Sequence, residues 1–516
     1  MSNRAGAGPE EFAAVPYHGI ITLSVMLATI MQALDSTIAN VALPHMQGAV
    51  SGTQDEMGWV LTSYIVAAAI TIPLTGWLSN AFGRRRVFLI SIVIFTIASA
   101  LCGLAETLPQ IVLFRLLQGI GGAALVPLSQ AVLFDINPPR NYGRAMSIWG
   151  VGVTMGPILG PALGGWLTDN YSWRWVFYIN LPIGVLAFVG LLLTLPESRQ
   201  TRSSGFDFFG FATLSLGVAA LQLMLDRGQL LDWFSSTEIM IEAAASGLGF
   251  YLFIVHMFTT DHPFVDPALF KDRNFLASNV FIFLVGIVLF ATLALLPPML
   301  QNQLGYPVVL TGLVTAPRGL GTLIGMFAVG RLLSLLDARH VIAAGLALTA
   351  YSLWRMTHFS LQMDYWPIVF SGVLQGLGIG LVYVPLSTVA FSTLPVALRN
   401  EGTALFSLMR NIGSSIGISV VTFLLTQNVQ RLHLALGTHI TPYNVASNPA
   451  ARAAHVDVSS ARGVAALDAM INNQATMIAY IDDFKLMMTL TLVTIPLLLL
   501  LKRAKPQAGA HAAVLD

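Results

Sequence analysis

Apolar runs long enough to cross a lipid bilayer recur along the whole of this 516-residue chain. Hydrophobic residues make up 55% of the sequence and charged residues only 10%, whereas a soluble domain carries about 25% charged residues. An apolar helix of roughly 18 residues or more spans the hydrocarbon core of a bilayer, which is about 30 Å thick. The sequence therefore predicts an all-α, polytopic membrane protein and not a soluble enzyme.

Fourteen of these runs are predicted to be membrane-spanning helices. In chain order the predicted spans are 19–41, 57–78, 87–105, 110–134, 145–167, 174–195, 208–226, 238–260, 274–300, 308–332, 339–359, 365–389, 400–425 and 482–501. We divide the chain into an N-terminal six-helix half (1–195), a linker with the inserted seventh and eighth helices (196–265) and a C-terminal six-helix half (266–516).

A sequence repeat supports this division into halves. The stretch LLQGIGGAALVPLSQAVL, Leu116 to Leu133, reappears as VLQGLGIGLVYVPLSTVA, Val373 to Ala390. The loop GWLSNAFGRRRVFLI after the second span is echoed by GRLLSLLDARHVIAA after the tenth. Duplicated halves around a site at the middle of the membrane are typical of transporters, and a channel or a membrane enzyme has no need of that symmetry.

Positive charges gather in the connections on one side of the predicted membrane. If the N-terminus is inside, the inner connections and the two tails hold sixteen lysines and arginines, and the short outer connections hold only Arg174 and Arg227. The sixteen are Arg4, Arg84, Arg85, Arg86, Arg140, Arg144, Arg199, Arg202, Lys271, Arg273, Arg331, Arg339, Arg399, Lys502, Arg503 and Lys505. Cytoplasmic loops are enriched in Lys and Arg, so both termini are predicted to be cytoplasmic.

One connection is much longer than the others. Residues 426–481 are polar and lie on the predicted outer side. The two ends of this connection look helical (QNVQRLHLAL and ARGVAALDAMINNQ), and its middle is rich in turn-forming residues (THITPYNVASNP). Two interpretations remain open: a solvated loop, or an element that docks a partner outside the cytoplasm.

Four motifs resemble those of one transporter family, the major facilitator superfamily. They are the loop GWLSNAFGRRRVF (Gly76 to Phe88), LFRLLQGIGGAA (Leu113 to Ala124), GVGVTMGPILGPALGG (Gly150 to Gly165) and LDSTIANVALP (Leu34 to Pro44). The third resembles the antiporter signature of helix 5, and the fourth resembles helix 1 of the fourteen-helix drug:proton antiporters. The resemblance extends over essentially the whole chain.

This resemblance implies a function. A member of the fourteen-helix drug:proton antiporters would be a proton-coupled exporter of lipophilic drugs, driven by the proton gradient without a cofactor and working by alternating access in the bacterial inner membrane. The resemblance also implies a periplasmic membrane-fusion adaptor and an outer-membrane channel as partners, in addition to membrane lipid. The net charge of +1 argues against a nucleic-acid partner, and the histidines lack the spacing of a metal site.

Two alternatives stay open at this point. One is a dedicated exporter of a single compound, such as a fatty acid, a siderophore or an antibiotic. The other is a membrane receptor or scaffold on the same fold that transports nothing. A phosphate-binding Walker sequence is absent from the chain, so ATP is not expected to drive transport.

The glycines of the predicted fifth helix recur every four residues and form a bare stripe on one helix face. The stripe and its neighbouring prolines are Gly152, Gly156, Pro157, Gly160, Pro161 and Gly164. Small residues at this spacing let two helices approach closely, and prolines kink a helix. The stripe is therefore either a simple packing face or, as the resemblance implies, the seam of a gate.

The loop after the second helix contains Gly76, Gly83, Arg84 and Arg85. Its arginines either fix the topology, as in any membrane protein, or form a latch with neighbouring helix ends, as the resemblance implies. The family usually has an aspartate where this loop has Asn80 and Ala81. The sequence therefore predicts no acidic partner within the loop itself.

One acid, Asp35, lies deep in the first apolar helix. It is about 16 residues into the span, or about 24 Å from the cytoplasmic end, and Arg115 is about 8 Å below the outer end of the fourth span. In a core of about 30 Å the two side chains lie at similar depth. They form either a structural ion pair or a proton-coupling pair, since intramembrane ionisable groups usually mark proton or substrate paths. In the second case Asp35 carries the proton, and Arg115 adjusts the affinity of Asp35 for that proton.

Two arginines, Arg318 and Arg410, lie near the middle of the membrane in the second half. The sequence suggests no acidic partner for them deep in that half. They either bond to backbone carbonyls or line a central cavity that favours anionic or weakly acidic lipophiles. We assign Gln32, Asn40 and Gln118 to the same substrate cavity.

Overall fold

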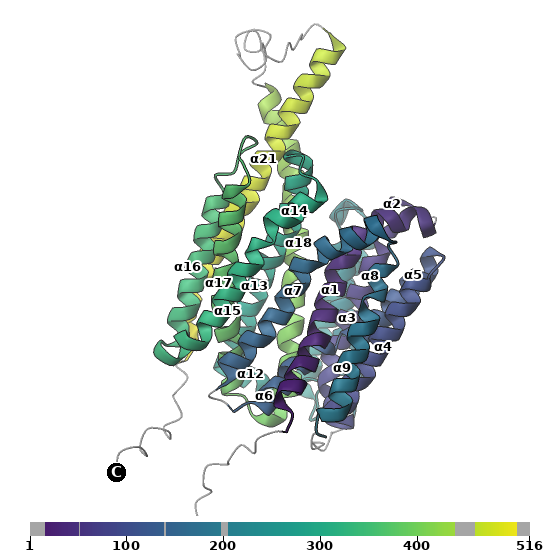
Figure 1. Ribbon diagram of the computed structural model, residues 1–516, viewed down its shortest axis with the longest axis vertical. Coiled ribbons are helices and arrows are strands. Elements are labelled where there is room, and N and C mark those ends of the chain that lie inside the picture. Colours follow the sequence, from purple (N-terminus) through teal and green to yellow (C-terminus); the bar gives the residue numbers. More distant parts are fainter. Residues whose placement is uncertain (1–15, 51, 139–140, 198–204, 439–459, 503–516) are drawn as a thin grey trace, which may run out of the picture.

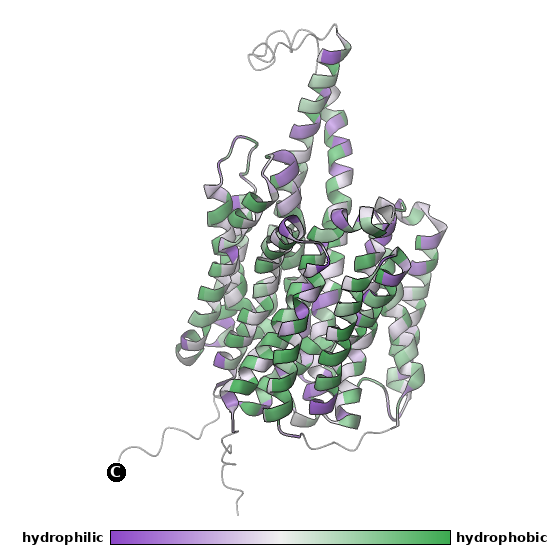
Figure 2. Ribbon diagram, turned by 45° about the vertical axis from the view of Figure 1, so that its right-hand side comes forward, coloured by the Kyte–Doolittle hydropathy of each residue, from purple (hydrophilic) through white to green (hydrophobic). Residues whose placement is uncertain are grey.

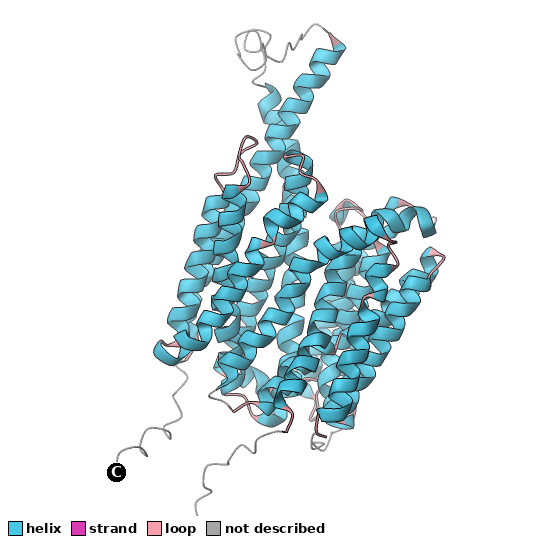
Figure 3. Ribbon diagram, viewed as in Figure 1, coloured by secondary structure: helices cyan, strands magenta, loops and turns pink. Residues whose placement is uncertain are grey.

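The computed structural model of this chain describes residues 16–50, 52–138, 141–197, 205–438 and 460–502. Within these residues every regular element is a helix (Figure 3). The helices form one elongated bundle, in which helices of the first half lie beside those of the second (Figure 1). Both described ends of the chain lie at the same end of the bundle, which we call the terminal face; the opposite end is the hairpin face.

The first half consists of nine helices in the described residues. They are α1 (His18–Val50), α2 (Gln54–Met57), α3 (Trp59–Phe82), α4 (Arg84–Leu104), α5 (Leu108–Gly122), α6 (Leu125–Ile136), α7 (Tyr142–Asn170), α8 (Trp175–Tyr178) and α9 (Asn180–Thr194). The predicted fourth and sixth spans are each interrupted once. Pro127 and Pro182 cause these breaks, because a proline has no N–H to donate to the carbonyl four residues earlier.

The inserted pair and the second half follow. The inserted helices are α10 (Phe208–Arg227) and α11 (Thr237–Thr259), joined by η2 (Trp233–Ser235). The second half contains α12 (Ala268–Lys271), α13 (Arg273–Pro298), η3 (Met299–Gln303), α14 (Val308–Thr315), α15 (Pro317–Leu335), α16 (Ala338–Met356), α17 (Trp366–Ser392), η4 (Val396–Leu398), α18 (Arg399–Thr438), α21 (Ala461–Thr494) and η5 (Pro496–Leu500).

All fourteen predicted spans fall on helices. By length and composition, twelve helical segments of the described chain are able to cross a membrane. The other two predicted spans are α7, which is rich in glycine, and α16, which has arginine near both ends. Apolar residues cover the body of the bundle, and polar residues gather toward its ends (Figure 2).

The halves meet along several helix pairs. Helix α7 of the first half packs against α15 and α17, and α18 of the second half packs against α3 and α6. Inserted helix α10 contacts both α3 and α18, and α11 packs on α10. The inserted pair therefore covers one seam between the halves.

A pair of long helices projects beyond the bundle at the hairpin face (Figure 1). The sequence predicted helical ends for the long connection, and this is confirmed: α18 continues to Thr438 and α21 begins at Ala461. Helix-forming residues continue beyond 425 and before 482, where the apolar composition of the predicted spans ends. His433 Nε2 and Asp468 Oδ1, 2.9 Å apart, link the two helices. We call residues 426–438 and 461–481 the helical hairpin; most of the turn-rich middle lies outside the described residues.

Candidate functional site

Asp35 and Arg115 are in direct contact inside the first half. The Asp35 side chain is 0% exposed and that of Arg115 is 1% exposed. Arg115 Nη1 donates to Asp35 Oδ2 at 2.7 Å. Gln118 Nε2 and Asn180 Nδ2 donate to Asp35 Oδ1 at 2.8 Å and 2.9 Å. Both carboxylate oxygens are therefore satisfied by donors from α5 and α9.

Arg115 is held by further contacts. Its Nε donates to the Val60 carbonyl at 3.0 Å, and its guanidinium carbon lies 4.3 Å from the centre of the Tyr64 ring. Tyr64 also accepts a hydrogen bond from Gln32 Nε2 at 3.1 Å. We call Asp35, Tyr64, Arg115, Gln118 and Asn180 the Asp35 cluster. It joins α1, α3, α5 and α9, so the site lies wholly within the first half.

Sequence reasoning placed Asp35 and Arg115 at a similar depth but missed Asn180. Asp35 lies about 17 residues into α1, about 26 Å from the terminal face. Asn180 begins α9 directly after the break between α8 and α9, so its amide is turned toward Asp35. A lone asparagine in an otherwise apolar predicted span was the available signal. Gln118, assigned from sequence to the substrate cavity, lies in the Asp35 cluster.

The cluster has a simple chemical consequence. A buried carboxylate is tolerated when a counter-charge and hydrogen bonds satisfy it. A proton on Oδ2 would occupy the oxygen that Arg115 contacts, so protonation and ion pairing compete at one atom. The cluster can therefore exist in a paired, charged form and in a protonated form with Arg115 released.

Arg410 and Arg318 lie in the second half. Arg410 Nη1 donates to the Tyr383 hydroxyl at 3.0 Å, and Arg318 Nη2 donates to the Leu289 carbonyl at 3.4 Å. Within the described chain, Arg410 Nε and Arg318 Nη1 are buried without a hydrogen-bond partner. Each guanidinium thus keeps an unused donor. Asn40, the remaining residue assigned to the cavity, is exposed on α1.

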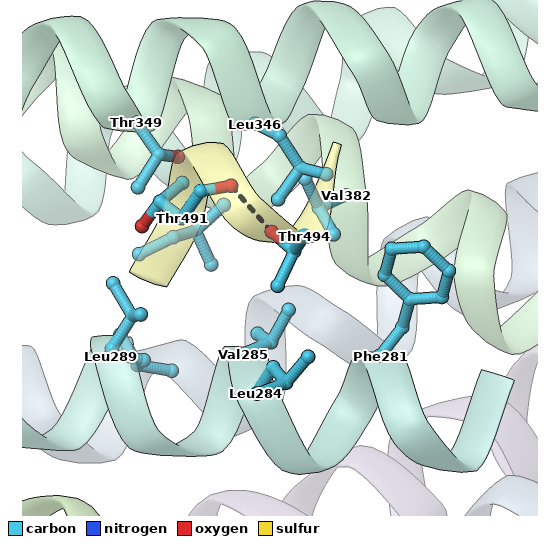
Figure 4. Close-up of a pocket in the computed structure, with 11 residues that line it drawn as sticks. Phe281, Leu284, Val285, Leu289, Leu346, Thr349, Val382, Thr491 and Thr494 are labelled. Atoms are coloured by element: carbon cyan, nitrogen blue, oxygen red, sulfur yellow. Dashed lines mark hydrogen bonds between the residues drawn. The ribbon is translucent and has the colours of Figure 1, made fainter. Parts of the chain in front are cut away.

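A small pocket lies between α13, α16, α17 and α21 (Figure 4). Its walls are mostly aliphatic, and its polar side chains are Thr349, Thr491 and Thr494. Thr494 Oγ1 donates to the Thr491 carbonyl at 2.5 Å. Leu289, whose carbonyl accepts from Arg318, is also part of the wall. The pocket belongs to the second half and is separate from the Asp35 cluster.

Hydrogen bonds close the terminal face between the halves. Arg84 Nε donates to Asn400 Oδ1 at 2.9 Å, Asn400 Nδ2 donates to Asn80 Oδ1 at 2.7 Å, and Asn80 Nδ2 donates to Glu401 Oε1 at 3.2 Å. Arg84 also forms an ion pair with Asp135. The acidic groups missing from the loop are therefore supplied by α6 and α18.

The other loop residues have structural roles at this face. A Cβ on Gly76 would lie 2.9 Å from the Glu401 Cα, so only glycine lets α3 and α18 approach this closely. Gly83 has a φ of 88°, which favours glycine. Arg85 Nη2 donates to the Leu192 carbonyl at 2.7 Å and stays within the first half.

Aromatic rings add to the contact between the halves. Phe134 of α6 lies 5.0 Å from Phe391 of α17, and Trp149 of α7 stacks on Tyr383 of α17 at 5.8 Å between ring centres. Since Tyr383 also binds Arg410, the stacked pair connects an arginine of the second half to α7 of the first.

The glycine stripe of α7 packs against α1. A Cβ on Gly156 would lie 2.2 Å from the Ala33 carbonyl carbon, and one on Gly160 would lie 2.2 Å from Thr37 Oγ1. Gly152 and Gly164 face Met26 and Ile38 of α1 in the same way. Helix α7 continues unbroken through positions 157 and 161, which are Pro157 and Pro161. The stripe therefore forms a close contact within the first half.

Comparison with known proteins agrees with this architecture. The sequence profile of the Major Facilitator Superfamily matches residues 25–418. Multidrug export protein EmrB of Escherichia coli (strain K12) is 39% identical over 428 residues, 82% of this chain and 83% of that protein. Fatty acid resistance protein FarB of Neisseria gonorrhoeae is 34% identical over 484 residues, 93% of this chain and 96% of that protein.

Solved structures share the fold. The human organic anion transporter MFSD10 matches with a TM-score of 0.59 at 15% identity, over 94% of this chain and 100% of that one. The proton:xylose symporter XylE matches with the same TM-score of 0.59 at 16% identity, over 94% of this chain and 97% of that one. The family predicted from the sequence motifs is confirmed: the chain belongs to the major facilitator superfamily.

Proposed function

We propose that this protein is a proton-coupled drug exporter of the bacterial inner membrane, with both termini in the cytoplasm. The similarity to multidrug export protein EmrB over 82% of the chain supports drug export. The observation that supports proton coupling is the fully buried Asp35 cluster, in which a proton and Arg115 compete for Asp35 Oδ2. The excess of Lys and Arg at the terminal face supports the orientation.

The proposed cycle is alternating access. The contacts of Arg84, Asn80, Asn400 and Glu401 close the terminal, cytoplasmic face in this conformation. A proton arriving from the outer side protonates Asp35 and releases Arg115. The first half then loses the ion pair between α1 and α5, while Gln118 still bonds to Asp35, and the halves rock so that the cytoplasmic face opens. Binding of substrate from the cytoplasm or the inner leaflet accompanies loss of the proton, and the pair forms again.

The proposed substrates are lipophilic compounds, with a preference for weak acids. Arg318 and Arg410 each keep an unused buried donor in the second half, and their positive charge favours an anionic group. A second candidate function, dedicated export of fatty acids, draws on the similarity to fatty acid resistance protein FarB over 93% of the chain. The variant Arg410→Ala tests the preference for weak acids. It is expected to reduce the export of acidic compounds and to leave the export of cationic drugs unchanged.

The proposed partners are a periplasmic membrane-fusion adaptor and an outer-membrane channel. The helical hairpin supports this, since it carries polar helix ends beyond the apolar body of the bundle (Figure 2). In this proposal the adaptor binds the hairpin and receives the substrate. Shortening both helices of the hairpin by the same number of turns tests this: export from whole bacteria is expected to fall while transport in proteoliposomes persists.

Proteoliposome transport tests proton coupling. Asp35→Asn alone leaves Arg115 as an unpaired buried charge, so loss of activity could reflect misfolding. The double variant Asp35→Asn with Arg115→Met removes both charges and is the matched control. We expect both variants to lose drug accumulation driven by a pH gradient, with the double variant keeping wild-type elution in size-exclusion chromatography. Wild-type antiport in the double variant would contradict the proposal.

A further inference from the structure

A second acid, Asp483, is buried in the second half. Its side chain is on α21 and the residue is 1% exposed. Neither Oδ1 nor Oδ2 has a hydrogen-bond partner within the described chain. Asp483 lies toward the outer end of its span and pairs with neither Arg318 nor Arg410. This lack of partners in the described chain sets Asp483 apart from Asp35, whose two oxygens are bound by three side chains.

The surroundings of Asp483 are apolar. Tyr480, Phe484 and Met487 lie within one turn of it and are buried in the same cluster. That cluster includes residues of the three long helices that pack against α21, among them Val288 of α13, Leu353 and Met356 of α16, and Val421 of α18. An ionised carboxylate without a partner is costly in such surroundings, so the protonated acid is the form that this conformation fits.

No cation of the neighbouring elements neutralises Asp483 in the described chain. Arg355 of α16 lies at a similar depth, but its side chain is exposed and lies 5.8 Å from the Phe370 ring centre. The other titratable groups on these elements lie at the terminal face, bind elsewhere or belong to the helical hairpin: Arg273, Arg339, His340, Tyr351, Arg399, Glu401, Arg410, Arg431, His433, Arg462 and Asp468. Of the neighbours of Asp483 on α21, Lys485 pairs with Asp482 at 3.0 Å.

Asp483 is close to the outer aqueous phase. It lies about 18 residues from Leu501 at the terminal face, or about 27 Å along the helix, in a core of about 30 Å. Asp35 lies at nearly the same depth. Asp482, the residue before Asp483, is 39% exposed. A proton therefore has only a short distance to travel between solvent and the buried acid.

The face of α21 that bears Asp483 also reaches the pocket. Thr494 lies eleven residues further along α21, about three turns, and so on the same face as Asp483. Thr491 and Thr494 face Leu289 and Val285 of α13 across the pocket (Figure 4). A change in the charge of Asp483 thus acts on a helix that forms one wall of the pocket.

We propose that Asp483 is a second proton-binding site, located in the second half, which binds a proton from the outer side and releases it in another conformation. In the conformation described here Asp35 is paired with Arg115, whereas neither carboxylate oxygen of Asp483 has a partner in the described chain. The two buried acids therefore have different surroundings in the two halves. The role of this site in driving export rests on the proposed function; the binding of the proton does not.

Carbodiimide labelling tests the site directly. Dicyclohexylcarbodiimide takes the proton of an acid in apolar surroundings onto a nitrogen, and the carboxylate oxygen adds to its central carbon. The resulting O-acylurea rearranges to an N-acylurea of the same mass, which remains on the residue. Purified full-length protein is labelled between pH 5.5 and 9.5, and its peptides are analysed by mass spectrometry. We expect Asp483 to be labelled at low pH, with labelling falling at least tenfold across the range, and Asp35 to stay unlabelled.

The control is Asp482→Asn, which changes the exposed neighbour and is expected to keep the labelling. No labelling of Asp483 at low pH, or equal labelling at every pH, would overturn the proposal. In proteoliposomes, Asp483→Asn is expected to release one proton fewer per drug molecule than Asp482→Asn. If the wild-type protein moves no protons with the drug while Asp483 labelling still changes with pH, the proposed function fails and the proton site stands.

Discussion

The Asp35–Arg115 pair predicts that its two single variants respond differently to pH. Arg115→Met keeps the aliphatic stem and removes the guanidinium, so Asp35 keeps two amide donors and loses its counter-charge. Removing one partner of a buried ion pair costs about 3–5 kcal/mol. Asp35 limits this cost by taking up a proton, which costs about 1.4 kcal/mol for each pH unit above about 3.9. The loss of unfolding free energy is therefore about 4 kcal/mol at pH 7 and about 1.5 kcal/mol at pH 5.

Asp35→Asn leaves the opposite charge behind. The guanidinium of Arg115 cannot lose its proton in this pH range, so no such relief exists. The loss of unfolding free energy is expected to stay at about 3–5 kcal/mol from pH 5 to pH 7. The double variant removes both charges and is expected to be more stable than either single variant at pH 7.

The assay is unfolding of the purified protein in mixed micelles with increasing sodium dodecyl sulfate, followed by tryptophan fluorescence at pH 5, 6 and 7. Arg115→Met should approach wild-type stability as the pH falls, whereas Asp35→Asn should not. Parallel pH profiles for the two single variants would refute the reasoning, because they would mean that Asp35 does not exchange a proton when its partner is removed.

Three further predictions concern packing, the terminal face and the inserted pair. Gly156→Ala should destabilise the protein by about 1–3 kcal/mol because its Cβ would overlap Ala33, whereas Gly247→Ala, which meets open space, should not; thermal unfolding in detergent compares them. Asn400→Ala removes the hydrogen bonds of Asn400 with Arg84 and Asn80 and so loosens the terminal face. A cysteine introduced at buried Ser79, on a Cys102→Ser background, should therefore react with maleimide several-fold faster in the Asn400→Ala variant than in the control variant Asn472→Ala. Burial raises the pKa of Asp207, but hydrogen bonds from Gly210, His256 and Phe264 outweigh this, so its pKa lies below the usual range. The stabilisation by Asp207 is therefore present above about pH 4 and is lost as the pH falls through the lowered value. The difference in melting temperature between wild type and Asp207→Asn should shrink as the pH falls below about pH 4.

Depth along a helix could be predicted from the sequence, and rotation about its axis could not. Counting residues put Asp35 and Arg115 at one level, and their contact follows because both lie in the same half. Asn180 was missed because its direction depends on the break between α8 and α9. The partners of the terminal-face loop, Asp135 and Glu401, come from distant helices, and only tertiary packing brings them to Arg84 and Asn80.

The limits of the predicted spans and the ends of the helices differ most in α18 and α21. Hydropathy marks where a chain leaves the apolar layer, and this differs from where hydrogen bonding along the helix stops. The predicted last span put Asp483 near the outer edge of the membrane, which agrees with its depth of about 27 Å along α21. The burial of Asp483 could not be predicted, because it depends on the packing of α13, α16 and α18 against α21.

The helical hairpin is a continuous extension of two helices of the second half. Helix α18 is 40 residues long, about 60 Å, so at least a third of its length lies beyond a core of about 30 Å. Because the same two helices form the wall of the second half and the projecting arm, the arm has no hinge of its own in the described residues. A rotation of about ten degrees in the second half would sweep a tip about 20 Å away through about 3–4 Å. A molecule bound to the tip would therefore move when the second half rotates, and its binding would favour or oppose that rotation.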